Sequence, residues 1–296
     1  MQPKLDVMTY TIRPARPEDH AAIAAFTEAT FEWGDYVIDA FDRWVADPNG
    51  LVVVAVDPSD QAVAMSRCGL LTATEGWLQG ARVRGDWRRR GIAGAMATAL
   101  TEWASSRGAR VLRLAVEDWN QPARGQVERD GFGRRSSWVY ATRSIGDASP
   151  LPSGNGGRRV AALEQLVRAH SSDAEPAYMA WSAGMLDRAA RGLFAATWTW
   201  RRLTPSDLAT AARGEALWNA RSGWVLAARR DEALEVGWLE TREEDATDLM
   251  RAIVDLAAAE GADRLLAMLP TLPWLTRAVR RAGCDVEPLS VYEKAL

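Results

Sequence analysis

Apolar positions along the first half of the chain follow two periods, and the change between them marks the predicted elements. Alternating or continuous apolar stretches predict strands, whereas apolar positions three and four residues apart predict amphipathic helices. Strands are expected at the start of 9–31, twice within 51–71 around a turn at 57–60, and over 76–85, 111–116 and 136–145. Helices are expected in the rest of 9–31, over 35–50, from Ile92 to Gly108, and over 121–132. This order predicts a mixed α/β fold with a strand, loop, helix and strand unit at its centre.

The loop of this central unit reads WRRRGIAGAM, residues 87–96. A loop that enters a helix presents unpaired backbone N–H groups and the positive end of the helix dipole, so it favours an anion. Gly91 lets the backbone approach a ligand closely, and Ala93 keeps the first turn uncluttered. Arg88, Arg89 and Arg90 can add charge-assisted hydrogen bonds to phosphate oxygens. An isolated arginine run is more often a solvated surface, but the preceding strand and the following helix favour a phosphate-binding backbone here.

Two segments match signatures of a known family. RRRGIA (88–93) fits the Arg/Gln-x-x-Gly-x-Gly/Ala signature of the GNAT superfamily of acyl-CoA-dependent N-acetyltransferases, and 117–132 resembles its second signature, an Asn before a short helix that ends in Gly-Phe. The resemblance covers about residues 9–145 and implies acetyl-CoA as donor, with its pyrophosphate on the loop amides and its pantetheine arm along the preceding strand. It assigns these residues to the donor: Ala81, Arg82, Val83, Arg88, Arg89, Arg90, Gly91, Ile92, Ala93, Gly94 and Asn120.

One position departs from the family pattern. Many members place a tyrosine five residues before the phenylalanine of the Gly-Phe pair, where its hydroxyl can protonate the leaving thiolate, but this chain has Val127 there. A thiol with a pKa of about 8.5 leaves without much help, so some members work without this acid. Asn120 and Tyr140 are the alternatives for its role.

The reaction also needs a group that removes a proton from the acceptor amine, because an ammonium ion has no lone pair for attack on a thioester. Glu75 stands at the start of the strand that leads to the loop, and Glu117 at the end of the next strand. Either carboxylate is a candidate base, and a chain of water molecules is the third alternative. Both also have ordinary interpretations, as a turn residue and as a surface acid at a strand end.

The acceptor is expected to contact an acidic and aromatic stretch. The family closes this region over its acceptor, and carboxylates with aromatic faces suit a cationic amine. A solvated acidic face with aromatic core residues is an equally good interpretation. The candidates for substrate contact are Glu32, Trp33 and Tyr36.

The sequence after Ile145 contains a linker and then a segment that repeats the pattern of the first part of the chain. A Gly/Pro/Ser-rich stretch at 146–157 indicates a linker, and helices are expected over 158–170 and 177–194. From 199 the sequence resembles its own beginning, and 246–268 aligns without gaps on 93–115. These observations predict an N-terminal GNAT domain (1–146), a linker with two helices (147–196) and a degenerate GNAT-like domain (197–296), which is a tandem GNAT fold with a mixed sheet flanked by helices in each half.

The alignment sets TREEDA (241–246) opposite RRRGIA. Acids at a helix N-terminus stabilise the helix themselves and repel a pyrophosphate. Pro270 and Pro273 also stand in the region that corresponds to Asn120. We therefore expect the second copy not to bind CoA and to act as architecture.

Composition excludes several other classes. The 296 residues include two cysteines and two histidines, which is too few for a disulfide framework or a histidine-rich metal site, so no metal is expected. A net charge of −3 does not favour nucleic acid, and the absence of a leader pattern or a long apolar run favours a cytoplasmic protein without a membrane partner. A monomer and a homodimer are both open.

The sequence therefore predicts an acetyl-CoA-dependent N-acetyltransferase that acts on a primary amine, expected to be a small molecule. The alternative is a noncatalytic acetyl-CoA-binding regulatory module, favoured by Val127 at the tyrosine position. A protein that binds nothing is disfavoured by the intact loop.

Overall fold

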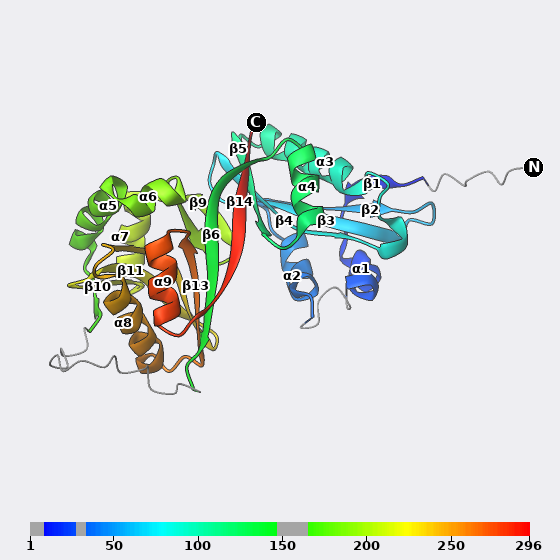
Figure 1. Ribbon diagram of the computed structural model, residues 1–296. Helices are drawn as coiled ribbons and strands as arrows, with labels where there is room; N and C mark the ends of the chain where they lie inside the picture. Colours follow the sequence, from blue (N-terminus) through cyan, green and yellow to red (C-terminus); the bar gives the residue numbers. More distant parts are fainter. Residues whose placement is uncertain (1–8, 28–33, 147–164) are drawn as a thin grey trace, which may run out of the picture. The chain divides into compact units, whose positions relative to one another are not determined.

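The computed structural model describes residues 9–27, 34–146 and 165–296, and the chain in it divides into two compact units (Figure 1). Unit 1 comprises residues up to Leu114, Pro122–Gly133 and Tyr292–Leu296, and unit 2 comprises Ala115–Gln121 and Arg134–Val291. The units therefore do not follow the order of the chain, since the last residues of the sequence belong to unit 1. In the described part of the chain, no helix is both long and apolar enough to cross a membrane.

Unit 1 is built on a sheet in which four antiparallel strands are followed by a parallel one. Its elements are β1 (Thr11–Pro14), α1 (His20–Thr27), α2 (Tyr36–Val45), β2 (Gly50–Val56), β3 (Ala62–Leu70), β4 (Glu75–Val83), α3 (Ile92–Ser106), β5 (Val111–Glu117) and α4 (Gln121–Arg129). Strands β1 to β4 pair antiparallel in chain order, and β5 pairs parallel to β4. Every strand and helix expected in the described part of 9–132 is present, with bounds that differ by a few residues.

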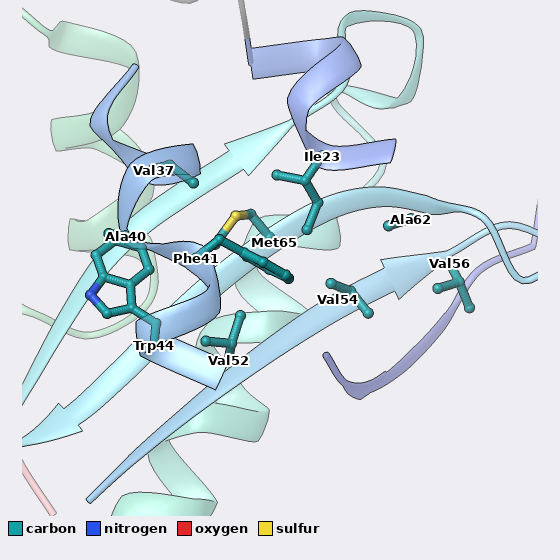
Figure 2. Packing of buried hydrophobic residues seen from close by; sticks show 10 residues of the cluster. All are labelled: Ile23, Val37, Ala40, Phe41, Trp44, Val52, Val54, Val56, Ala62 and Met65. Atoms are coloured by element: carbon teal, nitrogen blue, oxygen red, sulfur yellow. The ribbon is translucent and has the colours of Figure 1, made fainter. Parts of the chain in front are cut away.

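The core of unit 1 shows why these helices form where they do. Val52, Val54 and Val56 share one face of β2 because side chains alternate along a strand, and this face packs against α1 and α2 (Figure 2). Phe41 and Trp44 of α2 are one helical turn apart, so both point to the same face. Burial of this stripe, together with contacts from α3 to β2 and β3, fixes the strands that lead into the central loop.

Unit 2 contains both parallel and antiparallel strand pairs. Its elements are β6 (Gly133–Ser144), β7 (Val167–Arg168), α5 (Ala174–Ala183), α6 (Met185–Ala190), β8 (Leu193–Ala196), β9 (Thr199–Arg202), α7 (Pro205–Arg213), β10 (Leu217–Ala220), β11 (Gly223–Arg230), β12 (Ala233–Thr241), α8 (Ala246–Ala259), β13 (Arg264–Pro270), α9 (Pro273–Arg281) and β14 (Asp285–Ala295). Strand β12 pairs parallel to β13, as β4 pairs with β5 in unit 1. The element order from β9 to β14 repeats that from β1 to β6, except that one helix, α7, stands where the first copy has α1 and α2.

A local motif appears in both copies with the same atoms. Arg13 makes two hydrogen bonds of 2.8 Å to Asp19, and Arg201 binds Asp207 with bonds of 2.9 and 2.7 Å. In each copy the aspartate also accepts the backbone amide three residues before it, at the start of a helical turn that begins with proline. This repeated cap supports the duplication that the sequence predicts.

The C-terminal strand contributes to unit 1 at its end. The Leu296 amide donates to the Arg110 carbonyl, and the Glu293 carboxylate binds the Arg113 guanidinium at 2.7 Å. In unit 2, strand β6 pairs antiparallel along the whole of β13. The strand that follows α4 in the sequence thus belongs mostly to unit 2, while the end of the chain completes unit 1.

The segment between the copies corrects two expectations. Part of the helix expected over 158–170 lies outside the described residues, but Val167–Arg168 is a short strand that pairs with β10. The helix expected over 177–194 is two helices, α5 and α6, separated by Gly184, and it ends before strand β8 at Leu193. Residues that pair across a sheet can override a helical period, because strand pairing depends on distant partners.

Candidate functional site

Strand β4 pairs with β5 only over its first residues and continues toward the central loop without that pairing. Its parallel pairing with β5 joins Glu75–Trp77 to Val111–Arg113 and stops there. The antiparallel pairing with β3 continues but shifts register between Met65 and Arg67, opposite Gly80. Gly80 has a φ of +69°, and a Cβ there would lie 2.9 Å from the Trp44 ring, so glycine is required for both backbone and packing. The bulge redirects the last residues of β4, along which the pairing with β5 does not continue.

The loop after β4 has an unusual backbone. Arg89 and Gly91 have φ values of +62° and +76°, and Gly91 is the N-cap of α3. Among the residues that the structure describes, the first amide of this helix to donate to a backbone carbonyl is that of Ala95, which binds Gly91. The amides of residues 89–94 are therefore available for an anion at the positive end of a 15-residue helix.

A buried tryptophan anchors this loop. Trp87 is 2% exposed and lies between two guanidinium groups, those of Arg84 at 5.8 Å and Arg90 at 5.0 Å from its ring centre. Arg90 also donates to the Asp86 carbonyl at 2.9 Å, and Arg88 donates to the Val83 carbonyl at 3.2 Å. Two of the three arginines thus brace the loop, and all three are exposed. Sequence reasoning missed Trp87; its position directly before an arginine run was the only signal.

Among the donor residues of β4, Arg82 makes a well-ordered ion pair. Its guanidinium binds Asp35 through two hydrogen bonds of 2.6 and 3.0 Å, and the Asp35 side chain is 1% exposed. Asp35 also accepts the Val37 amide and so caps α2. Arg82 therefore ties β4 to the start of α2, while its neighbour Ala81 is exposed.

The predicted substrate residues are only partly described. Glu32 and Trp33 lie outside the described residues. Tyr36 is 53% exposed at the first turn of α2, with the Arg82 guanidinium 5.7 Å from its ring centre and an edge contact to Trp44. Tyr36 thus presents aromatic surface near the end of β4.

The two candidate bases have different surroundings. Glu75 is 8% exposed and binds the Arg113 guanidinium at 2.8 Å, at the end of β4 that is distant from the loop. Glu117 ends β5 and its carbonyl accepts the Asn120 amide at 3.0 Å. Within the described part of the chain, no ion pair of Glu117 is found, and its side chain is partly exposed.

The structure brings a different tyrosine to α4. At Val127 the helix has no hydroxyl, but Tyr292 of the C-terminal strand accepts from Arg124 Nε at 3.2 Å and donates to Glu128 at 3.4 Å. Tyr292 is fully buried, and its hydroxyl contacts two side chains of α4. Tyr140, the predicted alternative acid, lies in unit 2, where its ring contacts Trp198 at 4.9 Å.

The corresponding loop of the second copy lacks the backbone seen in the first. Every residue of Thr241–Ala246 is described, and none has a positive φ. Asp245 takes the N-cap position, Glu243 and Glu244 are exposed, and Glu243 lies 3.4 Å from Arg277. The acids thus occupy a helix start that lacks the left-handed residues of the first copy.

The end of β12, which corresponds to the end of β4 in the first copy, is covered by other residues of unit 2. The last four residues of β12, from Trp238 to Thr241, are all buried. The Ala195 carbonyl of β8 would lie 1.8 Å from a Cβ at Gly237, and Trp181 of α5 contacts Trp238 at 6.3 Å between ring centres. The segment between the copies therefore covers β12 where a ligand would bind.

One buried acid stands within this filled region. Glu240 is 9% exposed, and its Oε2 atom has no hydrogen-bond partner among the described residues. Burial raises the pKa of Glu240 to about 7. Only the charge of Glu240 could be read from the sequence, because its burial follows from the packing of α5 on β12.

The cysteine, histidine and acidic side chains were compared with the arrangements that hold metal ions, within the residues that the structure describes. Over the described residues, no cluster of three or more His, Cys, Asp or Glu side chains has a geometry for a metal ion. Cys68 and Cys284 are both buried and free, and burial raises the pKa of Cys68 to about 12.

Comparison with known proteins gives two findings and one negative result. Residues 19–132 match the family model described as Acetyltransferase (GNAT) family. The chain resembles a solved GCN5-related N-acetyltransferase from Sphaerobacter thermophilus, with 15% identity, a TM-score of 0.69, and coverage of 97% of this chain and 95% of that one. A search of curated proteins returned no match.

Two further solved structures match over nearly their whole length. One is a putative acetyltransferase from Thermoplasma acidophilum, with 17% identity, a TM-score of 0.59, and coverage of 97% of this chain and 100% of that one. The other is a tandem GNAT protein from the clavulanic acid biosynthesis pathway, with 14% identity, a TM-score of 0.57, and coverage of 97% and 98%. At these identities the matches show the fold, and they show it for both halves of the chain together.

Proposed function

Because residues 19–132 match the model of the GNAT acetyltransferase family and the chain has the tandem GNAT fold over its whole length, we propose that it transfers an acetyl group from acetyl-CoA to a primary amine of a small molecule. The first copy binds the donor, and the second copy does not. The division of the chain into a donor-binding domain (1–146), a linker (147–196) and a degenerate domain (197–296) is part of this proposal, as is a monomeric or homodimeric state.

The backbone of the central loop is the observation that carries the proposal. The amides of residues 89–94 precede the first internal bond of α3, and the left-handed Arg89 and Gly91 turn the chain within this run. Such amides at a helix N-terminus suit the two or more negative charges of a pyrophosphate. We assign the pyrophosphate to Arg89–Ala93 with Arg88 beside them, and the pantetheine arm to the edge of β4 from Ala81 to Val83. Acetyl-CoA supplies an acetyl group that is already activated as a thioester.

The remaining requirement is a base for the acceptor ammonium. Of the two candidates we favour Glu117, because the Glu75 carboxylate is held by the buried guanidinium of Arg113, whose side chain is 4% exposed. A carboxylate in such a pair gives up its ion-pair energy when it takes a proton, which makes it a poor base. Asn120 directly follows the turn after Glu117 and is proposed to orient the thiol side of the donor.

Calorimetric titration of acetyl-CoA into the full chain should give one site per chain. The acids of Thr241–Ala246 and their lack of positive φ leave the second copy without a cradle, so Glu244→Gln should leave both stoichiometry and Kd unchanged. Two sites per chain would show that the second copy binds the donor after all, and no binding would remove the basis of the proposal.

Release of CoA thiol in the presence of a panel of primary amines should be continuous, and Glu117→Gln should slow it at neutral pH by about a hundredfold or more, the usual contribution of a general base. The Kd for acetyl-CoA should stay the same in this variant. Glu102→Gln, an exposed acid on α3, is the control. If no amine supports release while acetyl-CoA still binds, the chain is the noncatalytic binding module that Val127 favours.

A further inference from the structure

A small cavity lies in unit 2 at the place where the parallel strands of the second copy part. The pairing of β12 with β13 ends at Val236 and Ala267, which corresponds to the end of the β4 and β5 pairing at Trp77 and Arg113. The cavity has a volume of about 30 Å³. Its lining residues come from β6, the turn between β8 and β9, β12 and β13, and they are Tyr140, Thr197, Trp198, Glu235, Val236, Gly237, Leu266 and Met268.

Two aromatic rings form one corner of this cavity. The ring centres of Tyr140 and Trp198 are 4.9 Å apart, and their planes are inclined at 50°. Trp198 is 43% exposed, which is unusual for a tryptophan in a folded protein and leaves part of its ring available for contact. The faces of both rings carry negative partial charge, so a corner between them attracts a cation.

The carboxylate of Glu235 also lines the cavity. The Glu235 side chain is 25% exposed, and burial raises the pKa of its carboxyl group and that of the Tyr140 hydroxyl. Glu235 accepts a hydrogen bond from Thr197 and forms an ion pair with Arg230 at 3.3 Å. The Arg230 guanidinium is 62% exposed, so it can leave the carboxylate for water when another cation arrives.

The turn that carries Trp198 is strained. Thr197 has a φ of +58°, although a β-branched residue is rarely found in the left-handed region. The cost of this conformation is offset where the Thr197 hydroxyl reaches Glu235 and the turn places Trp198 over Tyr140. Strained residues of this kind concentrate at sites that bind ligands.

We propose that this cavity binds the ammonium end of a primary alkylamine. A cavity needs about 10–15 Å³ of this kind of volume for one water molecule, so 30 Å³ admits about two heavy atoms, such as a terminal carbon and its nitrogen. The carboxylate of Glu235 pairs with the ammonium charge, and the rings of Tyr140 and Trp198 contact its N–H groups and the adjacent methylene. A quaternary ammonium is too large.

This site is separate from the proposed pyrophosphate and pantetheine site, since none of its lining residues belongs to the central loop or to β4. This cavity gives the degenerate copy a binding function of its own. It lies where β12 and β13 part, which corresponds to the place where β4 and β5 part in the first copy. Binding there does not depend on acetyl-CoA, so the inference can fail while the proposed function holds, and the reverse.

The test is a titration of the full chain with ethylammonium chloride, followed by NMR of carbon-13 labelled methionine methyl groups. Met268 lines the cavity, while Met65 and Met96 are buried in unit 1 and serve as internal references. We expect the Met268 signal to shift and saturate with a Kd in the millimolar range, because a ligand of three heavy atoms cannot bind much more tightly. Tetramethylammonium chloride and sodium chloride at the same ionic strength should leave it in place.

Variants separate recognition from general packing. Glu235→Gln should weaken ethylammonium binding at least tenfold, and Trp198→Ala should weaken it severalfold, whereas Trp119→Ala, at another exposed tryptophan, should have no effect. An unshifted Met268 signal in the native chain would overturn the proposal, as would an equal response to tetramethylammonium or an unchanged Kd in Glu235→Gln. Each variant is compared at a pH and temperature where its methyl spectrum retains the dispersion of the native chain.

Discussion

Replacement of Gly91 by glutamate is expected to abolish measurable binding of acetyl-CoA, while replacement by glutamine weakens it only severalfold. The structure separates three causes at this residue. No described atom lies within 4 Å of a Cβ built on Gly91, so neither side chain meets a steric obstacle. Both variants bear the same strain, because φ is +76° and only glycine adopts this region freely.

The two variants therefore differ in charge alone. Two unit charges about 4 Å apart repel by roughly 4 kcal/mol at the effective dielectric constant of a protein surface, which corresponds to more than a hundredfold in affinity. Calorimetric titration measures both Kd values, and thermal unfolding checks that the variants stay folded. Equal loss in both variants would mean that the backbone conformation, and not an anion at the loop, explains the sensitivity of Gly91.

Glu240→Gln is expected to stabilise the protein above neutral pH and to have no such effect in acid. Burial raises the pKa of Glu240 to about 7 from a value of 4.5, so the folded state holds a proton that the unfolded state releases. Stability from this group is complete below about pH 4.5 and is lost as the pH rises through 7. A shift of this size corresponds to roughly 3 kcal/mol, at about 1.4 kcal/mol for each unit.

Glutamine has a similar shape and does not ionise, so the difference in free energy of unfolding between the variant and the native chain should grow with pH. Urea unfolding at pH 5 and pH 8, followed by tryptophan fluorescence, measures this difference. Glu244→Gln, an exposed acid near the same helix start, is the control and should show no trend. A difference that stays constant with pH would show that Glu240 is ionised in the folded protein or reaches water there.

The strand, loop and helix arrangement around the central loop could be predicted from sequence because its determinants are local. A strand, three arginines, a glycine and a helix follow one another within residues 75–106. The Glu75 candidate shows where such reasoning stops. Its partner Arg113 lies 38 residues later, and only the parallel register of β4 and β5 brings the two side chains together.

The filling of the second copy could not be predicted either. The acids of Thr241–Ala246 predict a loop that does not bind a pyrophosphate, which stays a prediction, whereas the sequence around Leu193 was assigned to a helix and forms strand β8 instead. Strand β8 forms because its backbone pairs with β9 and passes the Gly237 backbone at close range, a contact for which glycine is needed. Similarly, β6 and β14 both carry a Val-Tyr pair, so their local patterns do not decide which unit each strand completes.

The membership of Tyr292–Leu296 in unit 1 has a consequence for synthesis. Residues up to Leu114 leave the ribosome about 180 residues before the strand that completes their sheet. At roughly 5–20 residues per second this interval is on the order of 10 to 40 s. During that time Arg113 lacks its ion-pair partner Glu293, and the unpaired edge of β5 can pair with a strand of another chain. The nascent first copy is therefore most vulnerable to aggregation and proteolysis until Tyr292–Leu296 have been translated.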